Sequence, residues 1–169
     1  VYHTQSGNTG RLAEAVFAGA RRVVETETVI KRAFDAGTDD LLACHGLLLG
    51  TPENFGYMSG ALKDFFDRTY YPCEGKLTGL PYAVFVSAGN DGTGAVREIG
   101  RIANGYGWKT VAEALIVRRQ IGEADLERAS EPLLHAIELG AAGAHDLALD
   151  AVELALEEPL VALLDERAH

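Results

Sequence analysis

Cysteine is scarce in this chain, which has only Cys44 and Cys73 among its 169 residues. Two isolated thiols do not form a disulfide framework, and neither belongs to the Cys-x-x-Cys spacing of zinc sites and redox motifs. We expect Cys44 in the core and Cys73 in an exposed loop. This use of cysteine indicates a protein of the reducing cytoplasm.

Long apolar runs are also missing. No run approaches the roughly 18 residues of a membrane-spanning helix, and no signal peptide is visible. The sequence therefore predicts no insertion into a membrane. The apolar segment 1–3 is short for a parallel strand, which usually has about five residues, so we expect native residues before Val1.

Positive charge is in short supply, because 15 Lys and Arg stand against 25 Asp and Glu, for a net charge of −10. Such a charge disfavours nucleic acids and anionic membranes as partners. It leaves open whether the acidic surface serves solubility or docking to a basic protein. The five histidines lack metal-ligand spacing and no Gly-x-Ser-x-Gly motif occurs, so the sequence predicts neither a metal centre nor a serine hydrolase.

The chain does contain an alternation of apolar strands and amphipathic helices, within a length that fits one domain. Short β-rich or wholly apolar runs predict five strands, at 1–3, 28–34, 46–50, 81–87 and 110–117. Apolar residues at helical spacing predict helices at 7–24, 38–43, 60–69, 95–104 and 124–149. This order predicts a parallel α/β sandwich.

The segment 4–9, called loop one here, is the most informative part of the sequence. It lies between the end of a strand and the start of a helix, and it consists of Thr4, Gln5, Ser6, Gly7, Asn8 and Thr9. The helix N-terminus offers unpaired N–H groups and the positive end of its dipole, and the hydroxyls add neutral donors. We therefore expect a phosphate site, although a simply capped helix start remains the alternative. The segment lacks the Gly-Lys-Ser/Thr ending of a P-loop.

Two further loops follow predicted strands at the same edge of the sheet, where ligands of such folds bind. Loop two consists of Thr51, Pro52, Glu53, Asn54, Phe55 and Gly56, and loop three covers residues 87–94, including Ser87, Ala88, Gly89, Asn90, Asp91 and Gly94. Together with loop one they suit a flat, phosphorylated ring system. The alternatives are that Phe55 is a core aromatic and that loop three is an ordinary turn.

These motifs, in this order, resemble a known family. Thr-Gln-Ser-Gly-Asn-Thr at 4–9 is similar to the FMN-phosphate loop of flavodoxins and of the flavodoxin-like NAD(P)H:quinone and FMN reductases. Gly-Thr-Pro at 50–52, Phe-Gly at 55–56, Met-Ser at 58–59 and Leu-Lys-Asp-Phe-Phe-Asp at 62–67 resemble the reductase branch more than the short electron carriers. The resemblance covers about residues 1–120.

The resemblance implies a flavodoxin-like three-layer α/β sandwich with a five-stranded parallel sheet in the order 2-1-3-4-5. It also implies non-covalent FMN. The phosphate would be held by loop one, the isoalloxazine flanked by Pro52, Glu53, Asn54, Phe55 and Gly56, and its pyrimidine side or the ribityl chain lined by Ser87, Gly89, Asn90, Asp91 and Gly94. No side chain is expected as a catalytic acid or base, because the flavin itself is the reactive group.

The implied function is an FMN-dependent oxidoreductase that passes a hydride from NAD(P)H through FMN to a quinone or similar acceptor. One alternative is a flavodoxin-type electron carrier, which binds FMN and redox protein partners without turnover of its own. A third reading is a regulatory domain that has lost the flavin. Flavin content and the rate of NAD(P)H oxidation distinguish the three.

The C-terminal segment 150–169 extends past a domain that we expect to be complete at residue 149. It contains six apolar residues that suit a buried face, namely Val152, Leu156, Leu160, Val161, Leu163 and Leu164. We expect a helical extension of the FMN-binding domain 1–149, packed either on its own domain or on a second subunit of a homo-oligomer.

Overall fold

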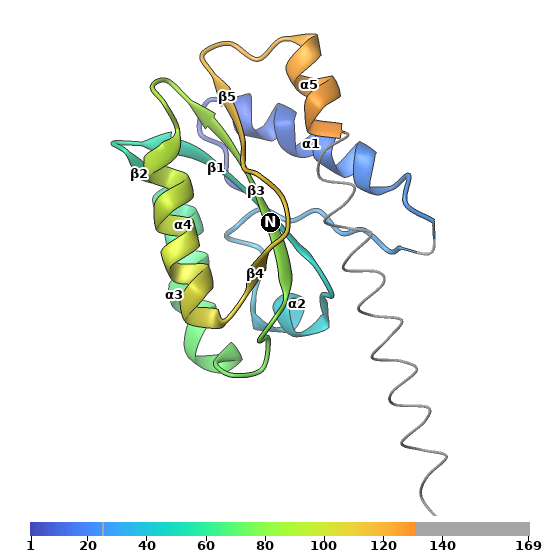
Figure 1. Ribbon diagram of the computed structural model, residues 1–169, viewed down its shortest axis with the longest axis vertical. Helices are drawn as coiled ribbons and strands as arrows, with labels where there is room; N and C mark the ends of the chain where they lie inside the picture. Colours follow the sequence, from blue (N-terminus) through green and yellow to red (C-terminus); the bar gives the residue numbers. More distant parts are fainter. Residues whose placement is uncertain (25, 131–169) are drawn as a thin grey trace, which may run out of the picture.

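The computed structural model describes residues 1–24 and 26–130, and Figure 1 shows their arrangement. The expected domain boundary at 149, most of the helix predicted over 124–149 and the expected extension 150–169 lie outside the described residues. None of the helices in the described part of the chain has the length and apolar character needed to cross a membrane.

The sheet is built around β1 (Leu47–Asn54) and β3 (Pro81–Ala88), which run parallel with Leu47 opposite Tyr82 and Pro52 opposite Ser87. On its other edge, β3 pairs in parallel with β4 (Lys109–Thr110) and then with β5 (Leu115–Arg118). At the far side, Tyr2 forms isolated parallel bridges with both Gly50 and Arg32. With the predicted strands numbered along the chain, the observed order is 2-1-3-4-5, which confirms the prediction.

The helices form a layer on each face of this sheet (Figure 1). One face is covered by α1 (Asn8–Ala20) and α5 (Glu123–Ser130), and the other by α3 (Gly60–Cys73) and α4 (Thr93–Tyr106), with α2 (Thr38–Ala43) packed against α3. Successive residues of a strand point to opposite faces. Phe85 therefore packs with α1 and α5, whereas Val84 and Val86 pack in the core under α3 and α4. The predicted three-layer sandwich is confirmed.

Helix α3 begins as predicted and continues further than predicted. The hydroxyl of Ser59 caps it by accepting from the Leu62 N–H at 3.4 Å, and the predicted stripe of Leu62, Phe65, Phe66 and Thr69 is buried. The helix runs on to Cys73 with Pro72 in its last turn. The expectation that Cys73 lies in an exposed loop is therefore wrong, because this extra turn buries the thiol against the core.

The other cysteine, Cys44, is half-buried, and burial raises the pKa of its thiol to about 11.

Three other predicted elements have different bounds in the structure. Helix α1 ends at Ala20 instead of residue 24. The segment predicted as a strand at 28–34 forms only an isolated bridge, between Arg32 and Tyr2. The short segment 1–3 pairs with it through just two backbone hydrogen bonds, from Tyr2 N–H to Lys31 O at 3.0 Å and from Ala33 N–H to Tyr2 O at 2.7 Å. The strand predicted at 110–117 is split into β4 and β5, and at the break the Thr110 hydroxyl donates to the Ala112 carbonyl, a local bond that competes with the ladder.

The close packing of Tyr2 beside β1 depends on Gly50. A Cβ on this residue would lie 2.2 Å from ring atoms of Phe85 and 2.9 Å from the Cβ of Tyr2. Real side-chain atoms do not approach so closely, so a glycine is required for Tyr2, Gly50 and Phe85 to pack as they do.

We predict that Gly50→Ala lowers the free energy of unfolding by about 1–3 kcal/mol, because it overpacks a filled core. Gly60→Ala is the matched control, since a Cβ there meets nothing within 4 Å and the residue is the first of α3. The control is expected to be neutral or to stabilise by about 0.4–1 kcal/mol. Urea unfolding followed by circular dichroism measures both, and equal losses would contradict the packing argument.

Candidate functional site

Loop one turns into α1 at Gly7. Gly7 is the N-cap residue and has a φ of 95°, a left-handed conformation that favours glycine, and its N–H donates to the Thr4 hydroxyl at 3.1 Å. A Cβ on Gly7 would meet nothing within 4 Å, so the space beside it is open. Among residues 1–24 and 26–130, no acceptor pairs with the N–H groups of Gln5, Ser6, Asn8, Thr9 and Gly10. This set of neutral donors at a helix N-terminus fits a phosphate monoester.

Loop two is not an irregular loop, as predicted, but the end of a β-hairpin. Strand β1 continues through Asn54, and β2 (Tyr57–Met58) returns antiparallel to it, with Glu53 opposite Met58. Phe55 and Gly56 form the two-residue turn, with φ of 53° and 72°, the positive values typical of a type I′ turn. Such a φ is unusual for a bulky residue and costs about 1–3 kcal/mol.

The hairpin directs Phe55 into solvent. Its side chain is fully exposed, so the alternative that it is a core aromatic is wrong. An exposed aromatic ring on a strained two-residue turn is well suited to contact a flat ring system, because stacking adds about 0.5–1.5 kcal/mol to the burial of the ring.

Loop three is held to the hairpin by the carboxylate of Glu53. One oxygen accepts from the Gly92 N–H at 3.0 Å and the other accepts from the Gly94 N–H at 3.1 Å. Within loop three, Asp91 accepts from both the backbone and the hydroxyl of Thr93, at 2.9 and 2.8 Å. These hydrogen bonds and the nearby charge of Arg118 keep the pKa of Asp91 below its usual value.

The donors that loop three offers to a ligand are therefore limited to its first half. In the part of the chain that the structure describes, the N–H groups of Gly89, Asn90 and Asp91 have no acceptor, whereas those of Gly92 and Gly94 belong to Glu53. All three residues with free N–H groups are exposed. We expect these three N–H groups, and not the later ones, to face a cofactor.

The structure brings the three predicted loops together by side-chain and backbone contacts. The Asn54 side-chain amide donates to Oε1 of the Gln5 side chain at 3.3 Å, which joins the hairpin to loop one. The buried hydroxyls of Thr9 and Ser87 share a hydrogen bond of 2.7 Å, which joins loop one to loop three. The clustering that the sequence analysis predicted thus occurs in the described structure.

Some of the predicted residues lie beneath the site instead of on its surface. The hydroxyl of Thr51 is fully buried, accepts from the Ser59 N–H at 2.9 Å and fixes the start of α3. The side chains of Thr9 and Ala88 are also buried. By contrast, Gln5 and Ser6 are exposed beside the open space at Gly7.

Sequence reasoning missed the residues that follow β5 at the same edge of the sheet. Arg118 ends β5 close enough to influence Asp91, and the Arg119 N–H donates to the Ala88 carbonyl at 2.7 Å. Arg119 has a φ of 65°, and both side chains are exposed. A basic pair directly after a predicted strand end was the available signal. These two arginines add positive charge to the edge that carries the loops.

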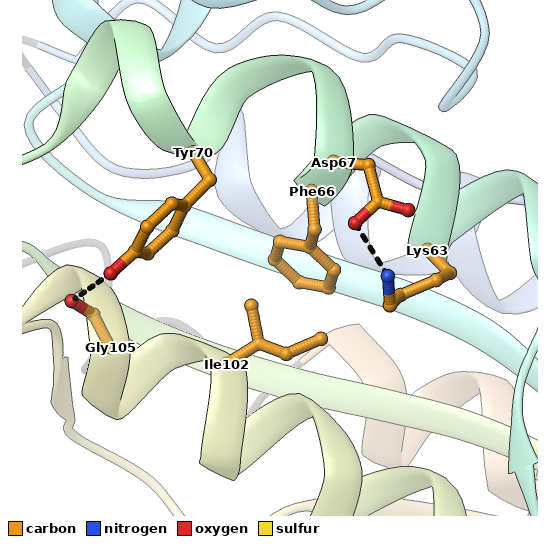
Figure 2. Close-up of a pocket in the computed structure, with 6 residues that line it drawn as sticks. All are labelled: Lys63, Phe66, Asp67, Tyr70, Ile102 and Gly105. Carbon is orange, nitrogen blue, oxygen red and sulfur yellow. Dashed lines mark hydrogen bonds and ion pairs between the residues drawn. The ribbon is translucent and has the colours of Figure 1, made fainter.

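A cavity of about 190 Å³ lies elsewhere, between α3 and α4 (Figure 2). It is lined by Lys63, Phe66, Asp67, Tyr70, Ile102 and Gly105. Its polar groups are paired with one another, since Lys63 forms an ion pair with Asp67 and the Tyr70 hydroxyl donates to the Gly105 carbonyl at 3.4 Å. None of the predicted site residues lines this cavity.

Comparison with solved structures confirms the flavodoxin-like fold. A flavodoxin from the domain Archaea superposes with a TM-score of 0.69 at 21% identity, over 85% of this chain and 96% of that one. A flavodoxin, WrbA-like protein of Agrobacterium tumefaciens gives 0.67 at 23% identity, over 85% of this chain and 94% of that one.

Comparison with curated sequences gives two kinds of relative. A flavodoxin of Aquifex aeolicus is 37% identical over a region that covers 56% of this chain and 51% of that protein. A NAD(P)H dehydrogenase (quinone) of Acidithiobacillus ferrooxidans is 33% identical, with 52% of this chain and 54% of that protein covered. The chain spans about half the length of the curated relatives that it matches.

The family model for NADPH-dependent FMN reductase matches residues 3–121, which include all three loops. This match covers well over half of the chain and supports FMN, whose phosphate the donors of loop one fit, as the cofactor. The chain therefore belongs to the family of NADPH-dependent FMN reductases.

Proposed function

We propose that the protein is an FMN-dependent oxidoreductase that oxidises NAD(P)H and reduces a quinone or a similar small acceptor. When bound, FMN would supply the hydride and electron-transfer chemistry between NAD(P)H and the acceptor. The proposal rests on the contacts that join loops one, two and three, beside N–H groups that have no acceptor among the described residues. Family membership and the quinone-reducing relative support it.

In this proposal each loop holds one part of the cofactor. The free N–H groups of loop one and the exposed hydroxyl of Ser6 bind the phosphate. Phe55 would contact the ring, and the N–H groups of residues 89–91 would donate to the oxygen-rich side of the flavin, where negative charge collects on reduction. The chain's residues bind and orient the cofactor, and no side chain is required to transfer a proton for hydride transfer.

A flavodoxin-type electron carrier is the second candidate, favoured by the 37% identity to the Aquifex aeolicus flavodoxin. Such a protein binds the same cofactor in the same loops and differs in having no rapid reaction with pyridine nucleotides. The reading as a regulatory domain without flavin is tested by the flavin content of the purified protein.

We predict that NADPH or NADH reduces the FMN-loaded protein faster than it reduces free FMN, and that a benzoquinone then reoxidises the protein. Stopped-flow absorbance of the flavin band measures both steps, and free FMN at the same concentration is the control. Slow reduction, no faster than for free FMN, together with rapid reoxidation by a protein partner would favour the electron carrier.

We further predict that Ser6→Ala weakens FMN binding by about tenfold to a hundredfold, because a hydrogen bond to a charged group contributes about 1.5–3 kcal/mol. Riboflavin, which lacks the phosphate, should bind almost unchanged. Fluorescence quenching measures both affinities.

Thr9→Ala is the control for that substitution, because the Thr9 hydroxyl is buried against Ser87. It should lower the free energy of unfolding by about 1–3 kcal/mol, because it leaves the buried Ser87 hydroxyl without its partner. Urea unfolding measures this loss. Equal losses of FMN and riboflavin binding in Ser6→Ala would show that loop one has only a structural role.

A further inference from the structure

The carboxylate of Glu53 joins the β1–β2 hairpin to the start of α4, beside loop three. It lies near the end of β1, and its two oxygens accept from the N–H groups of Gly92 and Gly94 at 3.0 and 3.1 Å. Gly92 is the N-cap residue of α4, a helix of 14 residues, and Gly94 is its second residue. The carboxylate therefore occupies the positive end of a helix dipole.

The charge of Glu53 has no basic partner among the described residues. The nearby Asp91 lies within the influence of Arg118, and the two arginines of α4, Arg97 and Arg101, both pair with Glu98. The ion pairs of residues 1–24 and 26–130 all involve other carboxylates. Within the described residues, the half-buried Glu53 is thus balanced only by the helix terminus that it caps.

The backbone around the two N–H groups that Glu53 accepts from is closely packed. A Cβ on Gly94 would lie 2.0 Å from the carbonyl oxygen of Gly56, so the hairpin turn and the start of α4 are in direct backbone contact. Gly92 has a φ of 76°, and a Cβ there would lie 2.5 Å from a methyl group of Ile116. The two hydrogen bonds place the negative charge beside Gly92, directly after residues 89–91, whose N–H groups have no acceptor among the described residues.

We propose that Glu53 is a positioning residue that lowers the reduction potential of the bound flavin. It withdraws two N–H groups and the helix dipole from the cofactor, and it places a fixed negative charge beside the N–H groups that remain. Reduced flavin carries negative charge near N1 and the C2 carbonyl, so this arrangement holds the reduced form less tightly than the oxidised form. The cofactor becomes a stronger reductant toward its acceptor. This inference rests on the proposed function.

Glu53→Gln tests the role of the charge, because glutamine keeps the length of the side chain and removes the charge. We expect the ratio of reduced to oxidised FMN affinity to rise about tenfold, which raises the two-electron potential by about 30 mV. The potential is measured by anaerobic titration with dithionite against a reference dye, without NAD(P)H. Glu113→Gln, which neutralises an exposed carboxylate before β5, is the matched control and should leave the potential unchanged.

Glu53→Asp separates the effect of the charge from that of the two hydrogen bonds, because it keeps the charge on a side chain too short to accept from both N–H groups. In the apoprotein, hydrogen exchange of the Gly92 and Gly94 amides should accelerate in this variant, while the affinity ratio stays within about twofold of wild type. A tenfold change in Glu53→Asp, or an unchanged potential in Glu53→Gln, would overturn the proposal. If Glu53→Gln does not fold, Glu53→Met, which has a similar length and no charge, replaces it and is expected to raise the potential by the same amount.

Failure of this inference differs from failure of the proposed function. A wild-type protein that binds no FMN would overturn both. A protein that binds FMN and reacts with NADPH, but whose Glu53→Gln variant has the wild-type potential, would overturn only the role assigned to Glu53. Loss of FMN binding by folded Glu53→Gln would also contradict it, because the charge would then be needed to assemble the site.

Discussion

The backbone contact between Gly56 and Gly94 is the constraint on which the site depends. It permits the β1–β2 hairpin and the start of α4 to touch, and only then does the Glu53 carboxylate reach the N–H groups of α4. The same hairpin places Asn54 against Gln5 and holds Phe55 in solvent. A side chain at Gly94 would separate these parts, so one glycine determines whether loops two and three form one surface.

The sheet supplies the rigid base below this surface. Strands β1 and β3 are parallel over six residue pairs, so their carboxyl ends present Pro52 and Ser87 side by side. The Thr9–Ser87 and Thr51–Ser59 hydrogen bonds are buried directly beneath the loops and fix the starts of α1 and α3. The polar groups of the site are thus mounted on a core in which both faces of the sheet are covered.

Much of this could be predicted from the sequence, because short apolar runs and helical periodicity fix the type and order of the elements. Parallel strands bring their carboxyl ends to one edge, so the approach of the three loops followed from the order alone. The hairpin could not be predicted, because Pro52, Asn54 and Gly56 are typical of loops, and strand pairing at Glu53 arises only from contact with β2. The family resemblance implied that Glu53 flanks the isoalloxazine, whereas its carboxylate accepts from the N–H groups of Gly92 and Gly94, about forty residues away in the sequence.

The central claim is that FMN binds the three loops at the carboxyl edge of the sheet. The most direct measurement is a titration of the isotope-labelled apoprotein with FMN, followed by amide chemical shifts. We expect the largest shifts at residues 5–10 and 89–91, with the Gly92 and Gly94 amides remaining protected from exchange. Shifts concentrated on α3 and α4 around the cavity at Tyr70, with loop one unaffected, would contradict it.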